Sequence, residues 1–204
     1  MSEKLKALYI KNSRLPSRYT EDITLYPQPA DVKAFERLDN IKNKITIFMK
    51  KHNNLLITSN NTGNGKTTWA AKIILHYIDS YAQEYSFKDN TPVLFVNIPE
   101  YLTKKKLAMS DKALAEEISE IEKAIFTAKI VVFDDIATKI ATDYDREVLY
   151  MYINNRTDNF LTNIYTTNIS IYNLSNELGS RLADRIIGYS TCIELNGAGM
   201  RGNA

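Results

Sequence analysis

The feature that most constrains this chain is an apolar segment that runs into a polar, glycine-containing loop. Residues 55–58 read Leu-Leu-Ile-Thr, and the loop ends in Gly-Asn-Gly-Lys-Thr-Thr at residues 63–68. Backbone N–H groups of such a loop point inward and bind anionic oxygens, and the positive end of a following helix adds to their effect. Apolar residues then recur at helical spacing from Trp69 to Ile78. The segment predicts a strand, a phosphate-binding loop and a helix.

The loop follows the P-loop pattern G-x-x-x-x-G-K-[ST] with one departure, because Asn60 occupies the place of the first glycine. Asparagine tolerates glycine-like backbone angles, so the departure is mild. Lys66 is expected to reach the β- and γ-phosphates, and Thr67 to offer its hydroxyl to Mg²⁺. The residues predicted to bind the nucleotide are Asn61, Thr62, Gly63, Asn64, Gly65, Lys66, Thr67 and Thr68.

A second motif consists of four apolar residues followed by two carboxylates, Ile-Val-Val-Phe-Asp-Asp at residues 130–135. A continuous apolar run is typical of a strand buried on both faces of a parallel sheet, and ligands bind at the carboxyl ends of such strands. Asp134 is predicted to hold Mg²⁺, and Asp135 to orient the attacking water. Many ATPases carry the longer glutamate at this second position. Together the two motifs predict a site for Mg²⁺ and ATP.

Two weaker polar signals lie in the last third of the chain. Asn168 follows a predicted strand, and its amide could bond both a phosphate oxygen and the lytic water, or simply cap a turn. Arg181 and Arg185 are four residues apart and therefore share one helix face. One of them could stabilise a phosphoryl group bound to a neighbouring subunit, or both could belong to a solvated basic face.

Strand and helix candidates alternate along the chain, which predicts an α/β fold with a parallel sheet between helices. Residues 1–30 are predicted to form an extended basic arm, because Pro16, Pro27 and Pro29 interrupt regular structure. Residues 31–204 are then the core. Within it, strands are expected at 54–58, 92–97, 130–134, 161–167 and 190–195, and helices at 31–51, 66–82, 143–156 and 177–187, with 99–127 mostly helical.

Bulk properties narrow the possibilities only a little. The 204 residues suffice for one domain, and a net charge of +2 neither requires nor excludes a nucleic-acid partner. The single cysteine, Cys192, excludes an internal disulfide, and no Cys/His cluster suggests zinc. No signal peptide or membrane-spanning stretch is recognisable, so a cytoplasmic location without membrane contact is expected. The lysines at 104–106 are either a DNA contact or a solvated helix end.

Taken in order, these motifs resemble the AAA+ core of the DnaC/DnaI-type replicative helicase loaders, whose relatives include the IstB transposition ATPases. The resemblance spans nearly the whole chain. The matching segments are Leu15-Pro16-x-Arg18-Tyr19, Gly63-x-Gly65-Lys66-Thr67, Phe133-Asp134-Asp135-Ile136, Asn155-Arg156, Thr167-Asn168, Arg181-Leu182-x-x-Arg185-Ile186 and Gly197-x-x-x-Arg201. The double-arginine helix and the glycine–arginine ending are the more family-like of these.

The resemblance implies a P-loop NTPase of AAA+ type with a five-stranded parallel sheet, which hydrolyses ATP with Mg²⁺. Asp134 then matches the Walker B aspartate, Asp135 the catalytic carboxylate and Asn168 sensor 1. Arg185 is the first candidate for the arginine finger and Arg181 the second, and Arg156 is a candidate for a further contact between subunits. The implied partners are single-stranded DNA, the replicative helicase of DNA replication and further copies of the chain, which assemble through the ATP site.

Four functions stay open at this point. A helicase loader is the leading hypothesis, although only about 30 residues precede the first core helix, where loaders usually carry a separate helicase-binding domain. A phage or mobile-element version would explain this. The alternatives are an IstB-like regulator of transposition, an ATPase-fold antagonist of a helicase or loader, and a small-molecule kinase. A small-molecule kinase would need an arginine-rich lid, and residues 137–142, which follow the acidic pair, contain no arginine. The sequence does not identify the residues that contact adenine, and residues 15–19 are named here only as a candidate segment.

Overall fold

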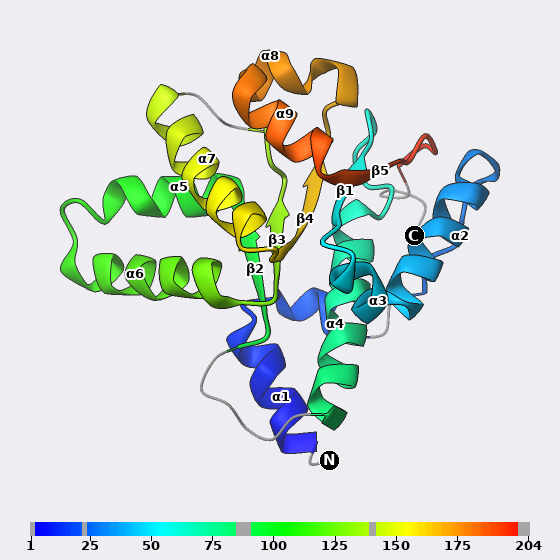
Figure 1. Cartoon of the computed structure of the whole chain (residues 1–204), viewed down its shortest axis with the longest axis horizontal. Helices are drawn as coiled ribbons and strands as arrows, with labels where there is room; N and C mark the ends of the chain where they lie inside the picture. The colour runs from blue at the N-terminus through cyan, green and yellow to red at the C-terminus, as the bar shows by residue number, and fades with distance from the viewer. Residues whose placement is uncertain (1–2, 22–23, 85–90, 139–141, 200–204) are drawn as a thin grey trace.

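The computed structural model describes residues 3–21, 24–84, 91–138 and 142–199, and its centre is one parallel sheet (Figure 1). The five strands lie in the order β2-β3-β4-β1-β5. Their bounds are β1 (Asn54–Thr58), β2 (Val93–Asn97), β3 (Ile130–Asp134), β4 (Thr162–Thr167) and β5 (Ser190–Glu194). The predicted parallel sheet is confirmed, and β4 lies between the phosphate-loop strand β1 and the Asp-Asp strand β3.

Helices cover both faces of the sheet because its strands are apolar on both sides. Alternate residues of a strand point to opposite faces, so Leu55 and Ile57 join one buried cluster while Leu56 joins the other. The helices of the first face are α1 (Glu3–Asn12), α2 (Val32–Asn43), α3 (Ile45–Lys50) and α4 (Lys66–Glu84). Those of the second are α5 (Ile98–Leu107), α6 (Lys112–Thr127), α7 (Asp143–Asp158), α8 (Leu174–Leu178) and α9 (Ser180–Gly188).

Two predicted helices are each divided in the structure. The helix expected at 31–51 is α2 and α3, separated at Lys44, whose φ of −118° and ψ of 28° are not helical. The helix expected at 177–187 is α8 and α9, separated at Gly179. Gly179 has φ +79°, a conformation that L side chains rarely adopt, so the chain changes direction there at little cost.

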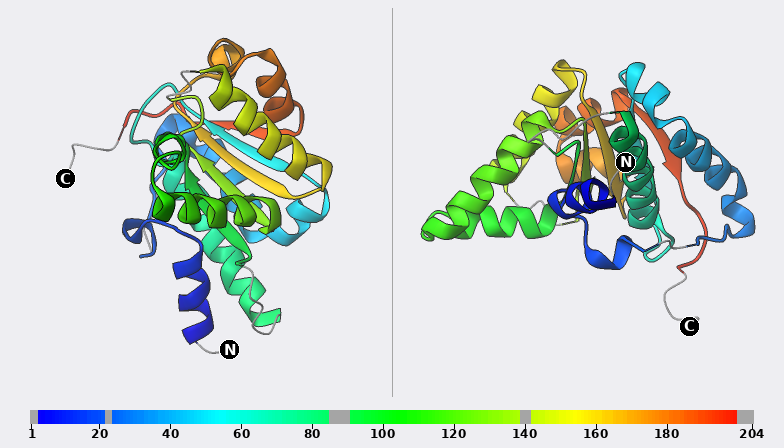
Figure 2. Two further views of the ribbon diagram at one scale, coloured as in Figure 1. Left: turned by 90° about the vertical axis from the view of Figure 1, so that its left-hand side faces the viewer. Right: turned by 90° about the horizontal axis from the view of Figure 1, so that it is seen from below.

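The prediction that residues 1–30 form an extended arm is wrong. Residues 3–12 form α1, which lies beside α4 (Figure 2, left). Tyr9 is only 1% exposed and packs edge-to-face on Tyr81 of α4, and Lys6 pairs with Asp79 at 2.7 Å. The prolines all follow α1, so they end regular structure rather than prevent it. Short 3-10 turns at Ser17–Tyr19 and Pro29–Asp31 interrupt the rest of the segment.

The segment that follows α1 lies against the outer edge of the sheet, at strand β2. The amide of Phe95 in β2 donates to the carbonyl of Ser13 at 2.7 Å, which bonds this outer strand to the N-terminal segment. In the ranges described above, no helix combines the length and apolar character needed to cross a membrane.

Candidate functional site

The polar residues of the separate sequence motifs meet at the carboxyl end of the sheet. A pocket of about 420 Å³ opens there, a size usual for small-molecule sites. The phosphate loop, the start of α4, Asp135 and Asn168 all line it. Arg18, Tyr19 and Leu25 complete the lining. Two residues of the candidate segment 15–19 thus lie at the pocket. Leu25 was not predicted from the sequence to lie there.

Asp134 is held by donors from three neighbouring elements. Its Oδ1 accepts hydrogen bonds from the hydroxyls of Thr67 (2.8 Å) and Thr166 (2.7 Å), and its Oδ2 accepts one from the amide of Asn97 (3.3 Å). Thr67 and Asp134, the two predicted Mg²⁺ ligands, are therefore adjacent. Sequence reasoning missed Thr166 and Asn97. Asn97 is the register partner of Asp134 across β2 and β3, which becomes visible only once the sheet order is known.

Asp135 and Asn168, both predicted to act on water, lie together at the pocket, just beyond the ends of β3 and β4. The Asn168 amide donates to Asp135 Oδ1 at 3.3 Å. Asp135 has φ +54°, a left-handed conformation that aspartate tolerates better than most residues, and its N–H donates to the Thr166 hydroxyl at 3.0 Å. Thr166 therefore bonds both members of the acidic pair and fixes the turn that places the second carboxylate at the pocket.

The phosphate loop closes around Lys66, which is 5% exposed. Its ammonium donates to the Asn61 carbonyl at 2.9 Å and to Asn64 Oδ1 at 3.0 Å. Gly63 and Gly65 have φ values of +76° and +93°, so both positions need a residue without a Cβ. Of the eight predicted loop residues, all but Asn61 line the pocket, and Asn61 contributes through its bond to Lys66.

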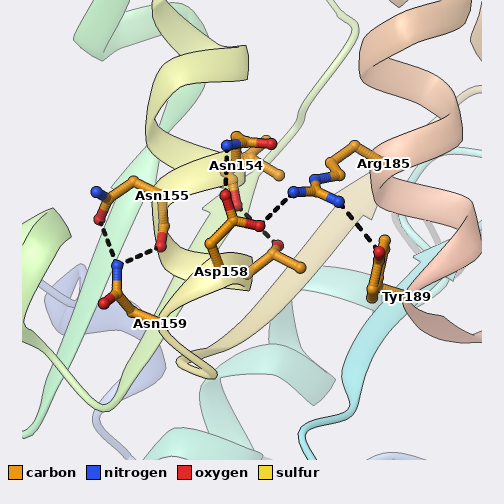
Figure 3. Close-up of polar contacts among 8 residues, drawn as sticks. Asn154, Asn155, Asp158, Asn159, Arg185 and Tyr189 are labelled. Carbon is orange, nitrogen blue, oxygen red and sulfur yellow. Dashed lines mark hydrogen bonds and ion pairs between the residues drawn. The ribbon is translucent and has the colours of Figure 1, made fainter.

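The two arginines of α9 do not line this pocket. Arg185 forms an ion pair with Asp158 at the end of α7 and donates to the Tyr189 hydroxyl at 3.1 Å (Figure 3). Tyr189 precedes β5 directly, so Arg185 lies near the amino end of the sheet. Arg181 is largely exposed and stacks over the ring of Tyr150 at 3.9 Å. The finger assignment stays a prediction, while Arg201 of the glycine–arginine ending lies outside the described residues.

The structure corrects the prediction that Arg156 makes a further contact between subunits. Its side chain is fully buried and donates to four acceptors within its own chain. They are Asn163 Oδ1 (2.5 Å) and the carbonyls of Ile125 (2.6 Å), Ala128 (2.9 Å) and Thr162 (2.7 Å). Burial lowers its pKa to about 9, still well above neutral pH. Arg156 therefore joins the amino ends of β3 and β4 and cannot reach another subunit.

The lysines at 104–106 are each engaged by a carboxylate, which favours the structural interpretation of this cluster over a DNA contact. Burial alone would raise the pKa of Glu122, one of those carboxylates, but hydrogen bonds from Lys105, Tyr152 and Tyr101 outweigh it and lower the pKa. The pairs are Lys104 with Glu100 (2.9 Å), Lys105 with Glu122, and Lys106 with Asp145 (2.7 Å).

Comparison with known proteins gives matches among solved structures. No family model matches the chain, and no curated protein matches its sequence. The crystal structure of the DnaC helicase loader superposes with a TM-score of 0.69 at 17% identity, covering 88% of this chain and 99% of that one. The crystal structure of DnaI gives 0.66 at 19% identity, with coverages of 89% and 95%.

Domain III of the replication initiation protein DnaA from Thermotoga maritima also matches, with a TM-score of 0.66 at 16% identity and coverages of 90% and 69%. These likenesses confirm the predicted fold, a five-stranded parallel sheet between helices. They also confirm, at the level of the fold, the resemblance to DnaC/DnaI-type proteins that the sequence motifs indicated.

Proposed function

We propose that this chain is a replication-related AAA+ ATPase that assembles on single-stranded DNA and delivers a replicative helicase. The ATPase part is supported by the residues around one pocket. Lys66, Thr67, Asp135 and Asn168 line it, and Asp134 is hydrogen-bonded to Thr67. The loader part is supported by the fold, since a DnaC helicase loader is among the similar structures. A replication initiator DnaA bound to AMPPCP and single-stranded DNA is another, with a TM-score of 0.65.

The residues at the pocket suit a triphosphate and its magnesium. Mg²⁺ prefers oxygen ligands and usually takes only one or two carboxylates from the protein, so Thr67 and Asp134 fit it. When bound, it neutralises charge on the phosphate oxygens. Lys66 supplies a second positive charge from within the loop. The N-terminal segment of the chain contributes Arg18, Tyr19 and Leu25 to the pocket, and these offer an amphipathic surface for the base and sugar.

Hydrolysis places a different demand on Asp135 and Asn168. Asp135 would accept a hydrogen bond from the attacking water and orient it, and Asn168 would hold that carboxylate through its amide while its carbonyl oxygen stays available to the water. The charge that develops on the transferred phosphoryl group needs a further cation. We assign that cation to Arg185 of a neighbouring subunit, with Arg181 as the second candidate, because both lie outside their own pocket.

The test compares Arg185→Ala with the wild type and with Arg181→Ala. We expect Arg185→Ala to bind Mg²⁺ and ATP normally in calorimetry, because Arg185 does not line its own pocket. Its ATPase rate, measured at concentrations where the wild type assembles, should fall by about 10³-fold, the usual contribution of an arginine finger. An unchanged rate would refute the assignment, and a loss in Arg181→Ala alone would transfer the role to Arg181.

Loading itself needs a separate measurement. Co-purification with candidate replicative helicases, in ATP and in ADP, should retain a helicase in one nucleotide state and release it in the other. Failure to retain any helicase would favour a transposition regulator. The short Asp135 also keeps a binding-only antagonist open, and steady-state turnover with and without single-stranded DNA distinguishes this case, since an antagonist should show none.

A further inference from the structure

Residues 195–199, called the tail here, pass between the phosphate loop and the start of α2. The tail continues from β5, since the amide of Leu195 donates to the Thr58 carbonyl at 2.9 Å, next to the beginning of the loop. Its amides face the start of α2 and its first carbonyls face the phosphate loop. The tail therefore contacts two segments that are more than a hundred residues away in the sequence.

The α2 side of the tail is anchored by Asp31, which is 2% exposed. Asp31 is the N-cap residue of α2, where a carboxylate ordinarily accepts from its own helix, but it makes no such bond. Instead its two oxygens accept from the amides of Asn196 (2.6 Å) and Gly197 (3.0 Å). Gln28 adds a two-way pairing with the backbone of Ala198. Hydrogen bonds to a buried carboxylate are among the stronger ones, so this is a firm anchor.

The loop side of the tail reaches Lys66 through two asparagines. Asn61 donates to the carbonyls of Asn196 (3.3 Å) and Gly197 (3.0 Å), and Asn64 donates to that of Leu195 (3.3 Å). The same two asparagines accept the hydrogen bonds of the Lys66 ammonium. A continuous series of bonds thus runs from Asp31 through the tail and the asparagines to the lysine that is expected to contact phosphate.

Close approach at two glycines shows how tightly the tail is fitted. A Cβ at Gly199 would lie 2.1 Å from the carbonyl oxygen of Thr62, a backbone atom of the phosphate loop. A Cβ at Gly197 would lie 2.5 Å from Asp31 Oδ2. Carbon atoms do not approach oxygen so closely, so any side chain at Gly199 must displace the loop or the tail.

We propose that the tail is part of the nucleotide site and that Asp31 is a positioning residue, which fixes the phosphate loop through the tail. The proposal rests on the proposed function, because it assumes that the pocket binds a nucleoside triphosphate. Its physical basis is preorganisation: a loop already held in its binding geometry loses less conformational freedom when phosphate binds.

The first test substitutes two glycines that differ in their surroundings. Gly199→Ala should raise the Kd for Mg²⁺-bound ATP by at least about tenfold in calorimetry, because the new methyl group forces the loop carbonyl away. Gly188→Ala is the matched control, since a Cβ there has nothing within 4 Å. Circular dichroism and thermal unfolding of both variants verify that they fold.

The second test uses Asp31→Asn, which keeps the shape of the side chain but removes its charge and one acceptor. In the nucleotide-free protein, amides of residues 59–65 should exchange hydrogen about tenfold faster. In the ATPase assay KM should rise more than kcat falls, because the residues expected to act on water are untouched. Asp39→Asn, also on α2 but paired with Lys42, is the control.

The outcomes separate the two ideas. If the wild type binds ATP, and both Gly199→Ala and Asp31→Asn match their controls in affinity and in loop exchange, the role of the tail is overturned and the proposed function stands. If the wild type takes up no Mg²⁺-bound ATP, the proposed function fails, and the tail's role in nucleotide binding fails with it. Faster loop exchange together with weaker ATP binding in Asp31→Asn supports the proposal even if Gly199→Ala does not fold.

Discussion

The two ends of the parallel sheet use similar polar residues for opposite purposes. At the amino end, the Arg156 guanidinium donates to four acceptors of its own chain, and the backbone N–H of Asn163 donates to Asn54 Oδ1 at 2.8 Å. At the carboxyl end, Asp134 is held by two hydroxyls and an amide beside an open pocket. A bound cation or water can replace neutral donors of this kind. Loss of the Arg156 contacts would instead leave buried carbonyls without a hydrogen-bond donor. The buried part of the amino end therefore serves the fold, and the carboxyl end is available to bind a ligand.

The largest expected effect tests the amino end. Arg156→Met should lower the free energy of unfolding by about 3–5 kcal/mol, because it leaves three carbonyls and Asn163 buried without their donor. Urea unfolding followed by circular dichroism measures this. Arg181→Met, at an exposed arginine, should stay within about 0.5 kcal/mol. A loss below about 1 kcal/mol for Arg156→Met would remove the contrast between the two ends.

The next effect tests the carboxyl end. Lys66→Ala should weaken ATP binding about 100-fold, or about 2.7 kcal/mol, because a charge-assisted contact to phosphate is lost. The same change should cost less than about 1.5 kcal/mol of unfolding free energy, since the acceptors of Lys66 at Asn61 and Asn64 lie beside the open pocket, where water can satisfy them. Lys50→Ala, at an exposed lysine on α3, is the control for charge. A Lys66→Ala variant that loses several kcal/mol of unfolding free energy and yet binds ATP as tightly as the wild type would reverse the assignment of the two ends.

The smallest effect concerns the surface of the amino end, where Asp158 pairs with Arg185 (Figure 3). Asp158 is half exposed and lies in the last turn of α7, where the helix dipole disfavours a carboxylate. Asp158→Asn should therefore change the unfolding free energy by no more than about 1 kcal/mol, and by less in 1 M salt. Asp184→Asn removes the same charge from an exposed position of α9 and serves as the control. A larger loss that persists in high salt would mean that this surface also supports the fold.

Much of the fold could be predicted because its signals are local. The strands are apolar runs such as residues 130–133, and the phosphate loop carries its pattern within a few positions. The division of two helices was missed because Lys44 carries no breaking signal and because one glycine, Gly179, does not by itself exclude a helix. Helix α1 was missed because its weakly amphipathic sequence was outweighed by the prolines that follow it.

The rest of the site depends on contacts between residues far apart in the sequence. The spacing of Arg156 cannot reveal that its side chain turns into the core, so it looked like Arg185, another arginine near a helix end. Asp31 resembles an ordinary helix cap, and only the fold brings it to Asn196, which follows it by 165 residues. Thr166 and Asn97 reach Asp134 only after the strands are placed in order. Residue type and local spacing predict the chemistry of a site better than they predict the contacts that support it.

The bond between Phe95 and Ser13 has a consequence for solubility. Strand β2 forms one border of the sheet, and unpaired strand borders invite pairing with other molecules, which leads to aggregation. The N-terminal segment blocks part of this border by occupying one of its donors. We expect truncation before Leu15 to uncover this donor and to favour aggregation, so a loss of activity in such a truncation would not by itself implicate the removed residues in catalysis.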